Sequence, residues 1–217
     1  MAKPETVVKI YEALTAHYGS LNWWPAKTPY EVMVGAILTQ NTAWHNVEKA
    51  IANFGDSLSP HFVLSADIDD LIDIIRPAGF FNQKAVYLKA MTEWFSRYNF
   101  DTLAAKDIPL NKLRRELLAV RGIGKETADC ILLYALELPT FVIDAYTVRL
   151  CERVGIDADK GYDALKAFFE KNLPKSVEIF NNYHALIVIN GKDHCRKSKP
   201  ICGTCPLKEM CDYAYRM

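Results

Sequence analysis

Apolar residues recur at helical spacing along most of the chain. Near the N-terminus, Val7, Tyr11, Leu14 and Tyr18 fall on one face of a helix that Gly19 is placed to end. Similar patterns predict helices around residues 30–38, 43–53, 67–76, 83–97, 107–120, 125–136, 145–154, 161–171, 176–189 and 206–214. Few segments alternate with period two, as half-buried strands do. The sequence therefore predicts an all-α fold.

Two breaks interrupt this helical pattern. The first is Asn22-Trp23-Trp24-Pro25, after which Thr28-Pro29-Tyr30-Glu31 has the form of a capping box with proline at the first helical position. The second is Leu138-Pro139-Thr140. A body of two helical lobes fits both breaks.

Composition narrows the class of protein. The 217 residues include 26 Lys+Arg and 26 Asp+Glu, so the formal net charge is zero, which excludes a uniformly basic DNA-coating protein but not a local basic patch. No apolar run approaches the ~20 residues of a membrane helix, and the N-terminal residues lack the apolar region of a signal peptide. We expect a cytoplasmic protein without a membrane partner, associated with the nucleoid if the source is prokaryotic.

Four of the six cysteines crowd into the C-terminal segment. Cys195, Cys202, Cys205 and Cys211 are separated by six, two and five residues, whereas Cys130 and Cys151 stand alone in apolar stretches. Without a secretory signal, such clustering indicates a metal centre rather than disulfides. Zinc is the general alternative, but its usual sites pair short Cys knuckles across a longer gap. The neighbouring basic residues are Lys192, Arg196, Lys197, Lys199 and Lys208, which predict either a solvated loop or a phosphate-binding face.

A glycine-flanked turn separates two predicted helices. Gly122-Ile123-Gly124 follows one helix, and Lys125 opens the next, which also contains Thr127. Glycine allows positive φ and close approach of a ligand to the backbone, and the amides of a helix N-terminus bind phosphate. The turn is therefore either a simple helix–helix connection or a site for the DNA backbone, in which Lys125 adds positive charge.

From about Pro29 to Cys211 the chain resembles the helix-hairpin-helix DNA glycosylases related to endonuclease III. The resemblance implies a monomer of two helical lobes with damaged double-stranded DNA and a flipped nucleotide in the cleft between them. One lobe comprises residues 26–137, with the hairpin motif at 117–130, and the other comprises 1–25 plus 138–217. The cysteine spacing matches the family's 4Fe–4S loop, in which four thiolates at 195–211 hold the cluster.

The resemblance also assigns a catalytic role to Asp144, which follows three apolar residues and opens a predicted helix. By itself an aspartate there is a helix N-cap. The two roles are compatible, because a carboxylate at a helix N-terminus stays ionised and fixed in orientation. It can stabilise the positive charge that develops on the sugar as a glycosidic bond breaks, and it can orient or deprotonate the attacking water.

Bifunctional relatives carry a nucleophilic lysine two residues beyond the second hairpin glycine. This chain has Glu126 at that position, and a carboxylate cannot form a Schiff base. Lys125 is one residue away, which turns its side chain by about 100°. We therefore expect a monofunctional glycosylase that uses water, in which Glu126 either assists through a water network or lines the pocket.

Tryptophans and two loops complete the predicted site. Trp23, Trp24 and Trp44 are either core residues or a base-stacking box, and the latter favours a cationic alkylated purine through cation–π attraction. The stretches around them resemble the 3-methyladenine glycosylase branch of the family. By the same resemblance, Gln40 and Phe80 fill the gap that a flipped nucleotide leaves in the duplex.

Three rival interpretations stay open. One is a bifunctional oxidised-pyrimidine glycosylase with AP lyase activity, which needs Lys125 or another lysine as nucleophile. A second is an adenine-mismatch glycosylase, although such enzymes generally carry an additional C-terminal domain. The third is a non-catalytic, structure-specific DNA-binding protein with a structural or redox iron–sulfur cluster.

Overall fold

The computed structural model describes residues 5–21, 23–157 and 161–216, so Asn22 of the first predicted break lies outside the described residues. The chain divides into two compact units. Residues 24–138 form one, which we call the central unit, and residues 1–23 together with 139–217 form the other, which we call the terminal unit. All regular structure in the described ranges is helical, which confirms the all-α prediction.

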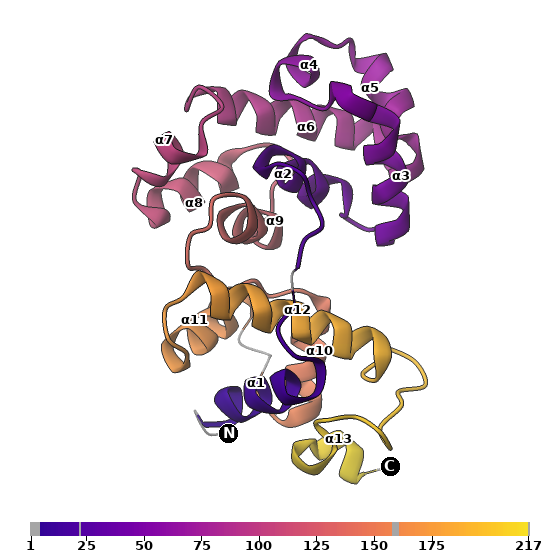
Figure 1. The fold of residues 1–217 in the computed structure, drawn as a ribbon, viewed down its shortest axis with the longest axis vertical. Helices are drawn as coiled ribbons and strands as arrows, with labels where there is room; N and C mark the ends of the chain where they lie inside the picture. The colour runs from indigo at the N-terminus through magenta and orange to yellow at the C-terminus, as the bar shows by residue number, and fades with distance from the viewer. Residues whose placement is uncertain (1–4, 22, 158–160, 217) are drawn as a thin grey trace. The chain divides into compact units, whose positions relative to one another are not determined.

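The helices follow in chain order (Figure 1). In the terminal unit they are α1 (Glu5–Tyr18), α10 (Ala145–Val154), α11 (Tyr162–Asn172), α12 (Val177–Asp193) and α13 (Asp212–Tyr215). The central unit contains α2 (Pro29–Leu38), α3 (Trp44–Phe54), α4 (Pro60–Ser65), α5 (Ile68–Ile75), α6 (Phe81–Ser96), α7 (Thr102–Lys106), α8 (Leu110–Ala119) and α9 (Lys125–Cys130). A π-helix over Ile131–Ala135 continues α9.

Helix α2 is the core of the central unit. Every residue from Val32 to Leu38 is buried, as expected for a helix that is apolar on all sides. It contacts α3, α6, α9 and the π-helix, which surround it in Figure 1. Its start has one half of the predicted capping box, because Thr28 Oγ1 accepts a hydrogen bond from the Glu31 amide at 3.1 Å and Pro29 occupies the first turn. The Glu31 carboxylate accepts from the Lys27 amide at 3.3 Å.

The terminal unit joins the two ends of the chain. Helix α12 packs against both α1 and α10. Phe141 and Phe169 stack with ring centroids 4.4 Å apart, and the buried Tyr183 hydroxyl donates to the Val7 carbonyl at 2.8 Å. The Asn182 side chain accepts a hydrogen bond from the Leu21 amide at 2.8 Å. The N-terminal helix is therefore an integral part of this unit.

The observed helices differ from the sequence prediction at short elements. Helices α4 and α7 were not predicted, because each spans fewer than two turns and has no periodicity to detect; instead Ser59 and Asp101 cap them through side-chain acceptors. Helix α12 continues to Asp193, beyond the predicted end at 189. The stretch 206–214 forms a 3₁₀ turn, Lys208–Met210, followed by the short α13. In the described part of the chain, no helix combines the length and apolarity needed to cross a membrane.

Candidate active site and cysteine loop

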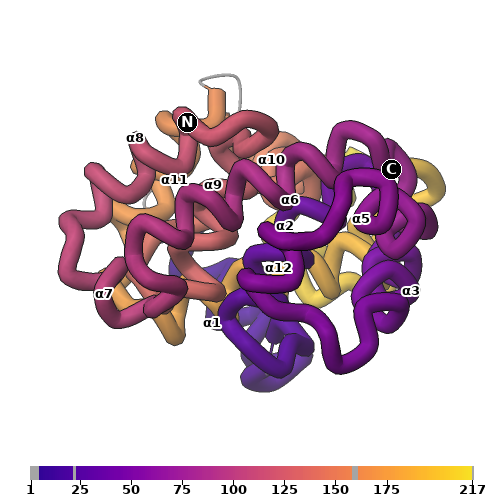
Figure 2. Tube along the Cα trace, turned by 90° about the horizontal axis from the view of Figure 1, so that it is seen from above, coloured from indigo at the N-terminus to yellow at the C-terminus, as the bar shows by residue number. Residues whose placement is uncertain are grey.

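The glycine hairpin lies between α8 and α9, which are neighbours in Figures 1 and 2. Gly122 has φ +85° and rests on the ring of Tyr87, so that a Cβ added to it would lie 2.1 Å from Tyr87 Cγ. Gly124 is extended and meets nothing within 4 Å. Ile123 is only 5% exposed and anchors the turn in the core. The hairpin thus requires glycine at Gly122 for both conformation and space.

The hairpin presents different side chains to solvent and to the interior. Gly124, Lys125 and Glu126 are exposed, whereas Thr127 is 7% exposed. Beneath them Arg114 binds the fully buried Asp129 through two hydrogen bonds of 2.9 and 3.0 Å, which ties α8 to α9. The exposed backbone of Gly124 and Lys125 is the part that a ligand can reach.

Gln40 is joined to the hairpin. Its Nε2 donates to the Gly122 carbonyl at 2.9 Å and to Thr127 Oγ1 at 3.0 Å. The loop that follows α2 is thereby fixed against the turn between α8 and α9. Both hydrogen bonds of the Gln40 amide lie within the central unit.

The three tryptophans of the predicted pocket fall into two groups. Trp24 and Trp44 meet edge to face with centroids 5.5 Å apart, and Tyr134 of the π-helix lies 5.0 Å from Trp24. Trp24 has φ +72°, and its indole rests on Gly35 of α2, where a Cβ would lie 3.3 Å from Nε1. Trp23 belongs to the terminal unit and has Lys192 Nζ 5.5 Å from its ring. The central unit therefore builds an aromatic group from Trp24, Trp44 and Tyr134.

Phe80 is an exposed aromatic residue in a strained conformation. Its side chain is 63% exposed, and its backbone is left-handed, with φ +48° and ψ +30°. Such a conformation costs a residue with a Cβ about 1–2 kcal/mol. The next residue, Phe81, is half-buried, with the Arg76 guanidinium 4.8 Å from its ring centroid. Of the two adjacent phenylalanines, Phe80 is the one available to a partner.

Asp144 is the N-cap of α10, as its position in the sequence predicts. Oδ1 accepts hydrogen bonds from the Thr147 amide at 2.7 Å and from Thr147 Oγ1 at 2.9 Å, and Oδ2 lies 3.5 Å from His184 Nε2. Burial by itself raises the pKa of Asp144, but the neighbouring His184 and the two bonds from Thr147 outweigh it and hold the pKa below its ordinary value. The carboxylate is therefore ionised at neutral pH.

The segment that leads to Asp144 is also held firmly. Phe141, Val142 and Ile143 are buried. The Glu170 carboxylate accepts a hydrogen bond from the Phe141 amide at 2.8 Å and binds Lys166 Nζ at 2.6 Å. This arrangement fixes the position at which the chain enters α10, and with it the orientation of the Asp144 carboxylate.

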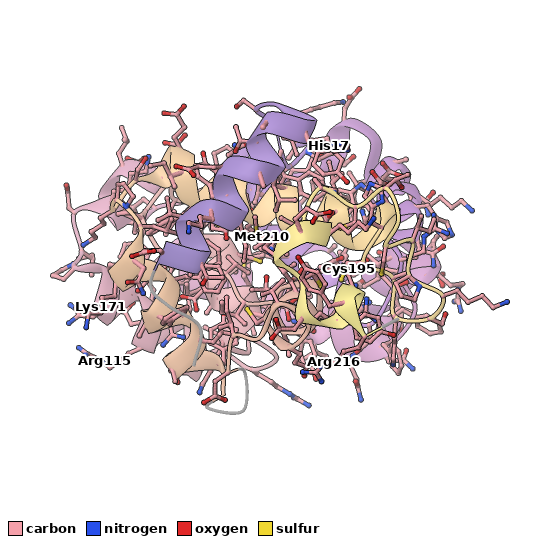
Figure 3. All side chains as sticks on the ribbon, turned by 90° about the horizontal axis from the view of Figure 1, so that it is seen from below. His17, Arg115, Lys171, Cys195, Met210 and Arg216 are labelled. Carbon is pink, nitrogen blue, oxygen red and sulfur yellow. The ribbon has the colours of Figure 1, made fainter. Side chains whose placement is uncertain are left out.

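The four C-terminal cysteines line one pocket, together with residues that include Arg153 and Tyr213. Arg153 Nη1 lies 3.1 Å from Cys195 Sγ, and Arg149 Nε donates to the Cys195 carbonyl at 2.7 Å. Figure 3 labels Cys195 beside the C-terminal segment, coloured yellow. Burial, with a smaller contribution from the neighbouring thiols, raises the pKa of Cys205. Cys130 and Cys151 are buried elsewhere.

The arrangement of the four thiols bears on what the pocket could hold. Within the described ranges, no three His, Cys, Asp or Glu side chains are grouped closely enough to hold one metal ion. A cluster of several irons needs only one cysteine at each corner, so its ligands surround a pocket instead of converging on a point. The exposed basic residues of the same segment are Lys192, Arg196, Lys197, Lys199 and Lys208.

The helical fold, the glycine hairpin, the buried Asp144 carboxylate and the four-cysteine pocket define a class of protein, the base excision DNA glycosylases. The chain belongs to the HhH-GPD superfamily of base excision DNA repair proteins, whose family model matches residues 34–175. It is 52% identical over 214 residues to the "Putative DNA repair glycosylase MJ1434" of Methanocaldococcus jannaschii, covering 96% of this chain and 97% of that protein.

Two solved structures share the fold. A non-covalent endonuclease III–DNA complex superposes with a TM-score of 0.84 at 20% identity, over 100% of this chain and 98% of that one. The Helicobacter pylori 3-methyladenine DNA glycosylase (MagIII), bound to 1,N6-ethenoadenine, superposes with a TM-score of 0.76 at 27% identity, over 88% and 98% of the two chains. The family match confirms the predicted family relationship, and the two superpositions confirm the helical fold.

Sequence reasoning missed three residues of this region: His184 beside Asp144, Tyr134 against Trp24, and Lys84 beneath the loops of Gln40 and Phe80. Each lies in a helix whose apolar pattern predicts a core face without singling out one member. A polar residue within an otherwise apolar stretch was the signal available for His184.

Proposed function

We propose that this glycosylase is monofunctional and removes alkylated purines from double-stranded DNA by hydrolysis. The observation that carries the proposal is the ionised Asp144 carboxylate, held by Thr147 and His184 at the start of α10. The exposed Glu126 stands where bifunctional relatives carry their nucleophilic lysine, which leaves water as the attacking group.

In the proposed reaction the bond between C1′ and the base nitrogen breaks, and its electron pair leaves with the base. Asp144 stabilises the positive charge on the sugar, and water then adds to C1′ and gives its proton to the Asp144 carboxylate, leaving an abasic site. A purine alkylated at N3 or N7 is already cationic, so it departs as a neutral base with little acid catalysis. The exposed Glu126 either lines the pocket or orders water near this site.

The aromatic group supports the substrate class. Trp24 is fixed by Gly35 below and by Trp44 and Tyr134 at its sides, so its indole is a rigid surface. A cationic base stacked on an indole gains about 0.5–2 kcal/mol from the cation–π interaction. The similar Helicobacter pylori protein, a 3-methyladenine glycosylase, was solved with a modified adenine bound. Trp23 belongs to the terminal unit, where its ring lies beside Lys192.

DNA is held by two sets of groups in the proposal. The turn Gly122-Ile123-Gly124, in which Gly124 is exposed, takes a phosphate together with the exposed Lys125, and the buried Thr127 hydroxyl supports the turn through Gln40. The basic residues of the cysteine segment add electrostatic attraction that weakens with salt. Gln40 and Phe80 occupy the gap left by the flipped nucleotide.

The cysteine pocket fits a 4Fe–4S cluster held by Cys195, Cys202, Cys205 and Cys211. When bound, the cluster supplies a cross-link that fixes the loop. Arg153 and Arg149 connect this loop to α10, the helix that Asp144 caps. Equal amounts of iron and acid-labile sulfide in the purified protein are expected, whereas zinc without sulfide would contradict the assignment.

The test is release of free methylated bases from alkylated DNA by the wild type and by Asp144→Asn. We expect release by the wild type, a loss of at least about 10²-fold in the variant, and product strands that break only after alkali treatment. Asn still caps a helix, so the variant should stay folded. No release from alkylated DNA by either protein would refute the substrate class.

The rival proposal is a bifunctional enzyme that acts on oxidised pyrimidines. The exposed Lys125 and the structural similarity to endonuclease III are the observations that favour it. It predicts a covalent protein–DNA adduct on borohydride reduction that Lys125→Gln abolishes. We expect no adduct. A non-catalytic DNA-binding protein would release no base from any damaged duplex.

A further inference from the structure

Lys84 is a buried lysine whose amine joins two loops. It lies in α6 and is 2% exposed. Its Nζ donates to the carbonyl oxygens of Leu38 and Ala78, each at 2.8 Å. Leu38 is the last residue of α2, and Ala78 ends the 3₁₀ turn before α6. A single nitrogen therefore fixes the separation of two segments that are far apart in the sequence.

Each of these carbonyls lies two residues before a side chain that is proposed to enter the DNA gap. Gln40 follows Leu38, and Phe80 follows Ala78. Both loops contain a non-glycine residue in the left-handed region, Asn41 at φ +53° and Phe80 at φ +48°. Such conformations persist only where the surrounding structure holds them. Lys84 is a buried group that binds the segments leading into both loops.

Burying the charged amine of Lys84 costs more free energy than burying an apolar side chain of similar size. Burial lowers the pKa of Lys84 to about 8, which means that placing its charge in the interior costs free energy. A methionine would occupy a similar volume without that cost, but it could not bind the carbonyls of Leu38 and Ala78. What the lysine adds is therefore the link between the two loops.

We propose that Lys84 is a positioning residue that sets the spacing of the Gln40 and Phe80 loops, so that both side chains can enter one gap in the duplex. The inference rests on the proposed function, because it presupposes base flipping. It assigns no catalytic step to Lys84, which acts only through the two loops.

The chain offers a matched control in Lys89. This residue lies on the same helix, and its Nζ also donates to two carbonyls, those of Leu64 at 3.0 Å and Ala66 at 2.6 Å. These carbonyls belong to the end of α4 and the connection to α5 rather than to the Gln40 or Phe80 loops. Lys89→Met thus removes the same kind of contact from the same helix.

The experiment measures binding to two duplexes, one undamaged and one with a tetrahydrofuran abasic-site analogue, which presents a gap without a base. We expect Lys84→Met to weaken binding of the tetrahydrofuran duplex by about tenfold. Binding of the undamaged duplex should be unchanged, and Lys89→Met should alter neither. A 2-aminopurine opposite the gap should lose the fluorescence change seen with the wild type, a readout that a merely structural role would not move.

Three results would overturn the inference. They are an unchanged preference of Lys84→Met for the tetrahydrofuran duplex, an equal loss of binding to the undamaged duplex, and the same loss of binding in Lys89→Met. If the wild type itself shows no preference for the tetrahydrofuran duplex, the proposed base flipping fails. If the wild type shows the preference and Lys84→Met keeps it, only the inference about Lys84 fails. Lys84→Arg keeps the donors but changes the spacing, so a reduced preference is expected. Should Lys84→Met not fold, an unchanged preference in Lys84→Arg refutes the proposal.

Discussion

The contact between Gly122 and Tyr87 makes the hairpin intolerant of a single methyl group. In Gly122→Ala the new Cβ would lie 2.1 Å from Tyr87 Cγ, at a backbone φ of +85°. The left-handed conformation costs about 1–2 kcal/mol for alanine, and forcing an extra methyl into a packed site costs about 1–3 kcal/mol. Rotation of the ring about its own axis does not move Cγ, so the side chain or the turn must shift. We expect a loss of about 2–5 kcal/mol in the free energy of unfolding.

The assay is urea unfolding followed by fluorescence and circular dichroism, with Gly124→Ala as the control. Gly124 belongs to the same hairpin, but its backbone is extended and a Cβ there meets nothing within 4 Å. The control should lose less than about 1 kcal/mol, the usual cost of alanine at an N-cap. In the double variant with Tyr87→Ala, the clash disappears and the two effects should be non-additive. Equal stability of Gly122→Ala and Gly124→Ala would refute the reasoning.

Three further outcomes can be checked. Arg114→Met removes the guanidinium from the buried Asp129 and should cost about 3–5 kcal/mol in urea unfolding, whereas Arg76→Met at an exposed pair should cost less than about 1 kcal/mol; equal losses would contradict this. Phe80→Asn should leave the free energy of unfolding unchanged or raise it by up to about 1 kcal/mol, because Asn tolerates the left-handed backbone. The same variant should bind the tetrahydrofuran duplex more weakly, and a clear fall in Tm would count against the reasoning. Because the folded pKa of Asp144 is depressed, its ionisation stabilises the protein above the ordinary value of 3.8, and this contribution is lost as pH falls through the folded pKa. The stability difference from Asp144→Asn should therefore shrink only in strong acid, and a difference that disappears near neutrality would be inconsistent with the geometry.

The sequence predicted features that depend on local chemistry. The N-caps at Thr28 and Asp144 and the turn at Gly122 follow from residue types at fixed offsets, and the structure has them. The family relationship followed from motifs spread along the chain, and the family match confirms it.

The sequence could not predict features that depend on packing. Nothing in the stretch FNQKAVYLKA marks Lys84 as a buried residue, yet it is 2% exposed and binds the carbonyls of Leu38 and Ala78. Tyr134 is brought to Trp24 by a π-helix, which shifts the helical register by an amount that 3.6-residue periodicity does not contain. Gln40 is bonded to the hairpin, and nothing in its neighbours in the sequence indicates that partner.

The composition of the terminal unit has a consequence for synthesis on the ribosome. Its first helix, α1, is made early. Helix α12, which packs against both α1 and α10, emerges only after the whole central unit. At about 5–20 residues per second, the 158 residues between the end of α1 and the start of α12 take roughly 8–32 s to translate. During that interval the apolar face of α1, formed by Val7, Ile10 and Leu14, has no native surface to cover it. The central unit can fold meanwhile, so the nascent chain passes through a half-folded stage in which chaperone binding is expected at its N-terminal helix.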